Sequence, residues 1–204
     1  MIENVLELNG LSIDVLEKLS FQSMMGKSLK KDLRYFDQEE LFAELARMTE
    51  WLTEQTLLDE IALDFRIKSL DSIKMKYDRY YPDSQVRKVF NDILGFRALC
   101  DDYIDLINDN SEVFRIADMS KGKANDDGYR GVHLYYQLDN NHYPIEIQFN
   151  TLFDRQINNW LHSFLYKKNY PNTVGKEMRK RYEEGKLRSR EEFEEVLKDV
   201  LCSG

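Results

Sequence analysis

Residues 132–149 have the sequence VHLYYQLDNNHYPIEIQF, and this stretch decides the fold. Apolar and polar side chains alternate in VHLYYQL and again in YPIEIQF, which is the period of a strand with one buried face. The turn-forming run Asp139-Asn140-Asn141 lies between them. The stretch therefore predicts a β-hairpin.

Two more strands are expected upstream of the hairpin. In IALDFRIK, residues 61–68, apolar side chains occupy every second position. A period of two places Arg66 and Lys68 together on one face of this strand. ILGFRALC, residues 93–100, has the apolar character of a buried strand, and a helix is expected before it from Leu70 to Tyr80.

Helical patterns lie on both sides of these strands. Asp37 and Glu40 form a capping box ahead of an apolar stripe at helical spacing: Leu41, Leu45, Met48 and Leu52. A second capping box, Ser189 and Glu192, precedes a C-terminal stripe: Phe193, Val196, Leu197, Val200 and Leu201. The C-terminal stripe docks either on a partner or on the chain's own core, and the sequence leaves both alternatives open.

Strands preceded and followed by helices predict an α+β protein with a mixed α/β sheet. We expect one domain over residues 1–204, with N-terminal helices in 1–60, a catalytic core in 61–170 and C-terminal helices in 171–204. A length of 204 residues and a hydrophobic content of 42% suit one domain with a core of its own.

Composition excludes several functional classes. Cys100 and Cys202 lie outside any CxxC pattern and the three histidines lack metal-ligand spacing, so neither a disulfide scaffold nor a zinc centre is expected. No apolar run is long enough for a membrane span and the first residues do not resemble a signal peptide, so we expect a cytoplasmic protein without a membrane partner. A net charge of −8 opposes nucleic-acid binding except through a local basic patch.

Cations and a hydroxyl recur where the first strand leads into the helix, in the pattern Arg66-x-Lys68-x-x-x-Ser72-x-x-x-Lys76. The strand presents the first two side by side, and the helix places Ser72 and Lys76 one turn apart on one face. With the partial positive charge of the helix N-terminus, this cluster suits a polyphosphate. The alternative is a solvated charged face.

Two carboxylates and one arginine stand at positions of chemical interest. Asp92 precedes or opens the second strand, where it is either a magnesium ligand or a turn residue. Glu146 shares its strand face with Gln148, and a carboxylate on a rigid strand can bind a metal or accept a proton. Arg97 lies inside an apolar run, where its guanidinium plane can stack on a base.

The run Gly128-Tyr129-Arg130-Gly131 places an aromatic side chain between two glycines. Glycines permit a loop that exposes the tyrosine ring for stacking on a base. The alternative is a tyrosine that packs under a turn.

In order and spacing, five blocks resemble the synthetase domain of the RelA/SpoT family in its short form, the small alarmone synthetases. The blocks lie between Phe65 and Lys168 and read RIKSLDSIKMK, NDILGFR, GYRGVH, YPIEIQ and NTL...HSFLYKK. The resemblance implies a mixed sheet of the nucleotidyltransferase type. It also implies a pyrophosphokinase that transfers the β,γ-pyrophosphate of ATP to a ribose 3′-hydroxyl, with Mg²⁺ as cofactor and AMP as by-product.

The resemblance also implies roles by position. The residues similar to the family's ATP-binding set are Arg66 and Arg97 for adenine, and Lys68, Ser72 and Lys76 for the triphosphate. The residues similar to its metal-binding and catalytic carboxylates are Asp92 and Glu146. The residues similar to its acceptor-binding set are Tyr129, which stacks on the base, and His133 and Gln148 beside it.

The acceptor side departs from the family pattern. Asn125 stands where alarmone-making members usually carry a lysine, the acidic pair Asp126-Asp127 follows it, and Asn150 replaces the family's arginine. Two adjacent carboxylates would repel the diphosphate of GDP. Compensation would have to come from a lysine of the same loop, Lys121 or Lys123.

A predicted basic stripe favours a polynucleotide acceptor. On a helix, positions i, i+3, i+4 and i+7 share one face, and this spacing fits Lys27, Lys30, Lys31 and Arg34. The toxic small alarmone synthetases are similar, and the likeness implies the 3′-CCA end of tRNA as acceptor, blocked aminoacylation and a neutralising antitoxin. The alternatives are an alarmone synthetase acting on GDP or GTP, and a catalytically inactive RNA-binding module. The oligomeric state, a homo-oligomer included, stays open.

Overall fold

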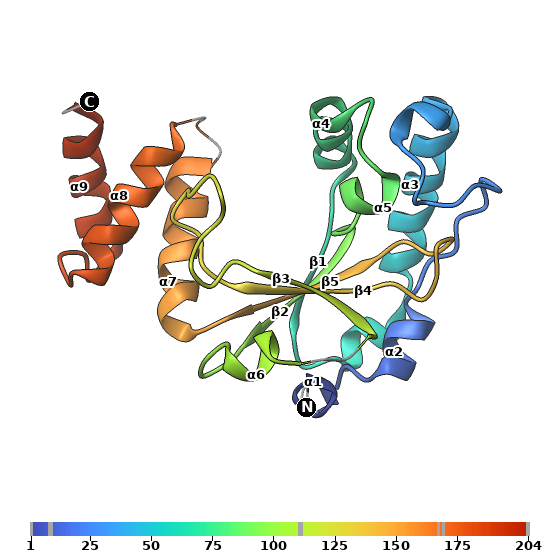
Figure 1. Cartoon of the computed structure of the whole chain (residues 1–204), viewed down its shortest axis with the longest axis horizontal. Coiled ribbons are helices and arrows are strands. Elements are labelled where there is room, and N and C mark those ends of the chain that lie inside the picture. The colour runs from blue at the N-terminus through green and yellow to red at the C-terminus, as the bar shows by residue number, and fades with distance from the viewer. Residues whose placement is uncertain (1, 8–9, 110–111, 167, 169, 203–204) are drawn as a thin grey trace. The chain divides into compact units, whose positions relative to one another are not determined.

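The computed structural model describes residues 2–7, 10–109, 112–166, 168 and 170–202 (Figure 1). The chain divides into two compact units. The first unit contains residues 1–98, 108–116 and 134–148, and the second contains residues 99–107, 117–133 and 149–204.

The sheet has five strands in the order β1-β2-β5-β4-β3. Their bounds are Asp64–Ile67 for β1, Leu94–Leu99 for β2, Phe114–Asp118 for β3, Val132–Tyr136 for β4 and Ile145–Asn150 for β5. The two strands of the predicted hairpin, β4 and β5, are neighbours, and β1 runs antiparallel to β2. The predicted fold class, a mixed α/β sheet flanked by helices, is confirmed.

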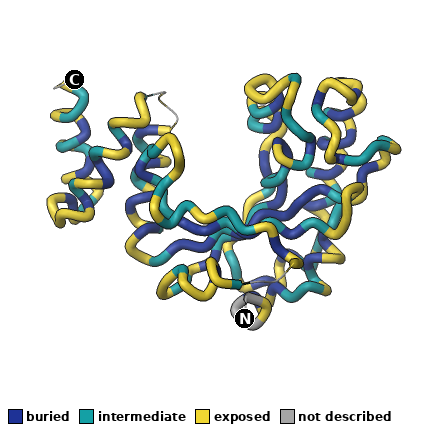
Figure 2. The backbone as a smooth tube through the Cα atoms, viewed as in Figure 1, coloured by how far each residue is buried: buried dark blue, intermediate teal, exposed yellow. Residues whose placement is uncertain are grey.

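The central strands are largely buried, as the dark blue segments in Figure 2 show. The buried apolar residues are Leu94, Phe96 and Ala98 of β2, Val132, Leu134 and Tyr136 of β4, and Ile145, Ile147 and Phe149 of β5. Period-two alternation puts the intervening residues on the opposite face. These intervening residues include Gly95, Arg97, Tyr135, Glu146 and Gln148, so the polar residues of the candidate site share one face.

Some helices of the first unit begin at a residue whose side chain caps them. The helical elements of this unit are α1 (Ile2–Glu7), α2 (Ile13–Lys18), the 3₁₀ turn η1 (Leu33–Tyr35), α3 (Gln38–Thr53), the 3₁₀ turn η2 (Thr56–Glu60), α4 (Leu70–Tyr80) and α5 (Val86–Val89). The backbone N–H of Glu40 donates to Asp37 Oδ1 at 3.0 Å, which confirms the cap of α3. The predicted stripe of α3 is buried, and α4 has the predicted bounds.

The predicted helix under the basic stripe is wrong. Residues 27–32 are irregular, because several of their backbone groups bond to distant segments of the chain. The N–H of Leu29 donates to the carbonyl of Asn140 at 2.8 Å, and the N–H of Val86 donates to the carbonyl of Lys31 at 3.1 Å. The helical spacing of the four cations therefore does not place them on one helix face.

The cations of this segment have different surroundings. Lys27 Nζ donates to the carbonyl of Tyr35 at 2.9 Å. Arg34 pairs with Asp83 at 2.5 Å. Lys30 and Lys31 are exposed. Of these four cations, Lys30 and Lys31 are therefore the ones that present their charge to solvent, as the predicted stripe requires.

The second unit contains α6 (Ile104–Ile107), α7 (Leu152–Leu161), the π-helical turn η3 (His162–Tyr166), α8 (Asn172–Glu183) and α9 (Arg190–Cys202). The C-terminal stripe packs within this unit: Phe193 and Leu197 join a buried cluster with residues of α7 and α8, such as Ile157 and Met178. Of the two alternatives for this stripe, docking on the chain's own core is the one observed. No helix among the described residues is long and apolar enough to cross a membrane.

Candidate active site

A pocket of about 240 Å³ lies in the first unit between β1 and α4. Its lining residues are Arg66, Lys68, Ser72, Met75, Lys76, Arg79 and Tyr80. The predicted cation cluster therefore converges on one cavity. Ser69 caps α4 by accepting from the N–H of Ser72 at 3.4 Å, and the positive end of the helix adds to the field of the cations.

Asp92 is held between two lysines of this cluster. Lys68 Nζ lies 2.5 Å from Asp92 Oδ2, and Lys76 Nζ lies 2.9 Å from Asp92 Oδ1. Burial raises the pKa of the Asp92 carboxyl, but the two ammonium groups outweigh burial and hold this pKa below its usual range. Asp92 is therefore an anion, and it lies before β2 begins, as one of the two sequence alternatives required.

A second pocket of the first unit is lined by Arg66, Asp92, Gly95, Phe96, Arg97, Glu146 and Gln148. Arg66 thus borders both pockets. Gly95 lies opposite Arg66 in the pairing of β1 with β2. A Cβ added at Gly95 would lie 3.6 Å from Glu146 Oε2, so the missing side chain leaves space beside this carboxylate.

Glu146 is 6% exposed, and both oxygens of its carboxylate accept hydrogen bonds. Tyr135 Oη donates to Oε1 at 2.9 Å, and Gln148 Nε2 donates to Oε2 at 2.6 Å. The guanidinium of Arg115 lies 4.0 Å from the centre of the Tyr135 ring. Sequence reasoning missed Tyr135 and Arg115, because no motif contains them and only strand pairing brings them to Glu146.

The acidic residues of the second pocket fit a magnesium ion that shares its ligands with a nucleotide. Mg²⁺ keeps several waters and usually binds one or two carboxylates together with substrate phosphates. Asp92 and Glu146 line one pocket and together supply two carboxylates. Among the described residues, no group of three or more His, Cys, Asp or Glu side chains forms a metal cage. A metal here would therefore depend on phosphate oxygens as well.

Tyr129 lies in the second unit, in a loop held by side-chain amides. Asn150 Nδ2 and Asn158 Nδ2 donate to the carbonyl of Arg130 at 2.9 and 2.7 Å. Tyr129 Oη lies 2.6 Å from His133 Nε2, so the two predicted acceptor residues are hydrogen-bonded to each other. A Cβ at Gly131 would lie 2.5 Å from Asn150 Nδ2, which explains the second glycine of the motif.

The acidic pair of the Tyr129 loop is neutralised within the loop. Arg130 Nη1 and Nη2 donate to the two oxygens of Asp126 at 2.7 and 3.1 Å, and Lys123 Nζ lies 2.7 Å from Asp127 Oδ2. The hydrogen bond from Arg130 holds the pKa of Asp126 below its usual range. Lys123 Nζ also lies 4.9 Å from the centre of the Tyr129 ring. The loop therefore does not present two uncompensated carboxylates, and the reason for expecting it to repel a diphosphate is removed.

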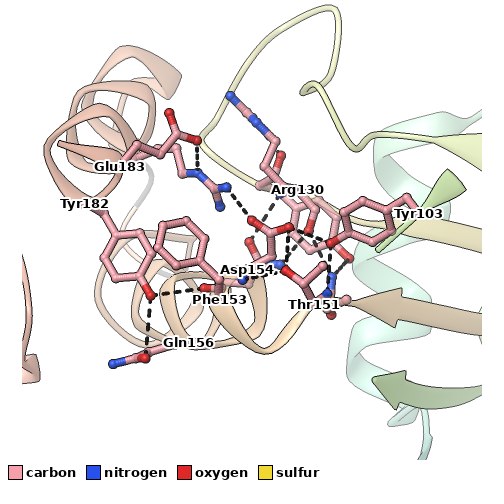
Figure 3. A network of polar contacts seen from close by, with 12 residues as sticks. Tyr103, Arg130, Thr151, Phe153, Asp154, Gln156, Tyr182 and Glu183 are labelled. Atoms are coloured by element: carbon pink, nitrogen blue, oxygen red, sulfur yellow. Dashed lines mark hydrogen bonds and ion pairs between the residues drawn. The ribbon is translucent and has the colours of Figure 1, made fainter. Parts of the chain in front are cut away.

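A buried ionic network fixes the helices next to this loop (Figure 3). Asp154 accepts from Tyr103 Oη at 2.6 Å and pairs with Arg179, which in turn donates to Glu183 at 2.6 Å. Burial and the bond to Asp154 raise the pKa of Tyr103 above its usual range, so the phenol stays a donor. This network joins the start of α7 to α8, and no pattern in the sequence predicted it.

Residues 65–171, more than half of the chain, match the family described as "Region found in RelA / SpoT proteins". The chain belongs to the RelA/SpoT family and is a pyrophosphokinase. No curated protein matches its sequence.

Several solved structures are similar to this chain. Small alarmone synthetase 1 from Bacillus subtilis is 24% identical with a TM-score of 0.44, and the match covers 80% of this chain and 97% of that one. Small alarmone synthetase 2 from Bacillus subtilis is 20% identical with a TM-score of 0.44, with 82% and 97% covered. A GTP pyrophosphokinase family protein from Streptococcus pneumoniae is 23% identical with a TM-score of 0.41, with 81% and 90% covered. The family assignment rests on residues 65–171 alone.

Proposed function

We propose that this pyrophosphokinase transfers the β,γ-pyrophosphate of ATP to the ribose 3′-hydroxyl of a guanosine nucleotide, GDP or GTP, in the cytoplasm. The observation that carries the donor half of the proposal is the Lys68–Asp92–Lys76 cluster, whose cations line one pocket while its carboxylate lines the adjoining one. Phosphoryl-type transfer needs positioning and charge neutralisation more than covalent catalysis. Such a cluster supplies both.

On the donor side, Lys68, Ser72 and Lys76 bind the triphosphate of ATP. The guanidinium planes of Arg66 and Arg97 hold adenine, since planar cations stack on bases. Arg79, which sequence reasoning did not include, lines the same pocket as the lysines and adds positive charge. Binding through so many cations orients the β-phosphorus for attack.

The reacting groups meet at the two carboxylates. Asp92 and Glu146 would hold Mg²⁺, and the ion would supply positive charge against the phosphates that are transferred. Glu146 accepts the proton of the 3′-hydroxyl as the ribose oxygen attacks the β-phosphorus. The bond from the β-phosphorus to the α,β-bridging oxygen then breaks, and AMP leaves with that oxygen.

The acceptor base stacks on Tyr129, with His133 as a further contact. Support for a guanosine nucleotide comes from the charges of the Tyr129 loop: Asp126 and Asp127 are each paired with a cation, and Lys123 lies beside the ring. An acceptor diphosphate therefore meets a balanced loop, with Lys123 available in place of the lysine that Asn125 replaces.

A second candidate acceptor is the 3′-CCA end of tRNA, with the protein acting as a toxin that an antitoxin neutralises. Asn125 and Asn150 favour it, because both replace family cations that hold an acceptor diphosphate, which a terminal adenosine lacks. The exposed pair Lys30 and Lys31 is the part of the predicted patch that remains for a phosphate backbone.

ATP labelled at the γ-phosphorus, incubated with GDP, GTP or tRNA, tests the proposal. We expect label in guanosine products and stoichiometric AMP. Label in tRNA alone would establish the second candidate, and tRNA without its CCA end would then stay unlabelled. If no acceptor yields AMP, the protein is a catalytically inactive RNA-binding module, and the proposal fails. The Glu146→Gln variant is the matched control and should be inactive but folded.

A further inference from the structure

Three neighbouring strands bring Arg115, Tyr135 and Glu146 into one row across the first unit. The three residues lie on β3, β4 and β5, which are adjacent in the sheet. Arg115 covers the Tyr135 ring at 4.0 Å, and Tyr135 Oη donates to Glu146 Oε1 at 2.9 Å. The row therefore ends at the carboxylate of Glu146, which we propose accepts the proton of the 3′-hydroxyl.

A carboxylate turns readily about its last side-chain bond unless both oxygens are held. Gln148 holds Oε2 of Glu146 at 2.6 Å, and Tyr135 holds Oε1. The Tyr135 hydroxyl is the donor in its contact with Glu146, because the oxygen of an ionised carboxylate can only accept a hydrogen bond. The two donors fix the plane in which the carboxylate faces the pocket.

The Tyr135 phenol is itself fixed by its surroundings. An arginine stacked on an aromatic ring restricts the ring and gains cation–π attraction. Arg115 of β3 lies over the Tyr135 ring, and the phenol oxygen reaches Glu146 of β5, the strand on the other side of β4. The Tyr135 side chain is therefore held by contacts with both neighbouring strands.

We propose that Tyr135 is a positioning residue for the pyrophosphate transfer, which aims the Glu146 carboxylate at the 3′-hydroxyl, and that Arg115 supports Tyr135 in this role. The proposal rests on the proposed function, since it takes Glu146 as the group that accepts the proton. Tyr135 is not among the residues that line the two pockets. Its loss should therefore reduce the rate of the bound complex and leave nucleotide affinity unchanged.

Tyr135→Phe, compared with Tyr136→Phe, tests the proposal. Tyr136 carries the same substitution one residue later, on the buried face of β4, where it packs against Phe114. We expect Tyr135→Phe to lower kcat by about 10–100-fold, the usual effect of removing a group that orients an active-site ligand, with the KM for ATP within about twofold. Tyr136→Phe should keep the original kcat. Arg115→Leu should lower kcat less than Tyr135→Phe does.

The Glu146→Gln variant distinguishes failure of the proposed role of Glu146 from failure of the positioning role of Tyr135. If this variant transfers pyrophosphate at the original rate, the proposed role of Glu146 fails. If it is inactive while Tyr135→Phe matches Tyr136→Phe in kcat, only the positioning role of Tyr135 is overturned. A rise in the KM for ATP with unchanged kcat would also overturn it, because that result indicates a binding role. Thermal unfolding of each variant checks that the fold is retained.

Discussion

Lys68 Nζ lies 2.5 Å from Asp92 Oδ2, and this ion pair joins a residue proposed for the triphosphate to one proposed for the metal. Lys76 makes the second contact with the same carboxylate at 2.9 Å. Without nucleotide, the cations and the anion of the site neutralise one another. If magnesium and ATP bind as we propose, the phosphates would replace Asp92 as partner of the lysines, and Asp92 would be free to hold the metal.

Asp92→Asn should therefore bind metal-free ATP more tightly than the unaltered protein. The substitution removes a negative charge beside the phosphates and releases two lysines, and we expect a gain of about fivefold, corresponding to about 1 kcal/mol of relieved repulsion. Calorimetric titration in the presence of a chelator measures this affinity. Asp71→Asn, at an exposed position in the first turn of α4, should change it little. Equal affinity of the Asp92 variant and the unaltered protein would contradict the exchange of partners.

Asp92→Ala should reduce the free energy of unfolding by about 3 kcal/mol, since it leaves the buried Lys68 ammonium without its carboxylate. Lys68 is 9% exposed, so water compensates this loss poorly. Lys76→Met should cost less, because Asp92 keeps Lys68 as a partner. Urea unfolding followed by tryptophan fluorescence compares the two variants. The reverse order of stability would show that Lys68 does not depend on Asp92.

Gly95→Ala should retain the fold and lose activity. The added methyl group would stand 3.6 Å from Glu146 Oε2, an ordinary contact that the strand tolerates but that fills space in the second pocket. We expect the free energy of unfolding to change by no more than about 1 kcal/mol. The rate of AMP release should fall at least about tenfold, which corresponds to about 1.4 kcal/mol of lost transition-state stabilisation. An active variant would show that this space is not used.

Gly175→Ala should destabilise the second unit, although alanine is normally the better helix former. A Cβ at this position of α8 would lie 2.1 Å from the carbonyl oxygen of Asp127, so helix and loop must separate. We expect a net loss of about 1–3 kcal/mol in the free energy of unfolding, the usual cost of overpacking, together with a raised KM for the acceptor. Lys176→Ala, at the next and exposed position of α8, is the control and should leave both quantities almost unchanged.

The double variant Lys30→Glu, Lys31→Glu distinguishes the two candidate acceptors. If tRNA is the acceptor, reversing two exposed charges should weaken its modification by about tenfold or more at low salt, since phosphate contacts dominate such binding. Transfer to GDP or GTP and the affinity for ATP should not change. Unaltered tRNA modification would show that these lysines do not contact tRNA.

Local sequence signals predicted the elements whose structure is set locally. The cap at Asp37, the bounds of α4 and the hairpin of β4 and β5 are such cases, because periodicity and turn residues determine them. Convergence of the site residues was also predicted, as far as the two pockets show it. The irregular conformation of residues 27–32 was not predicted. Their backbone bonds to Asn140 and residue 86, and such long-range pairing overrides a chance helical spacing.

Strand pairing explains the other omissions. Tyr135 and Arg115 belong to no motif, and they meet Glu146 only through the order of β3, β4 and β5. The pairing of Lys123 with Asp127 and of Arg130 with Asp126 also depends on how the loop folds back. The amino-acid composition includes these charges, but it does not show that they form ion pairs with one another.

Arg66 borders both pockets, and this shared wall limits how the enzyme can be redesigned. A substitution there would alter nucleotide recognition and turnover at once, so neither property can be tuned through Arg66 separately. Met75 and Tyr80 line the pocket of the lysines and not the one that holds the carboxylates. Substitutions at these two side chains therefore alter the first pocket without changing the lining of the second.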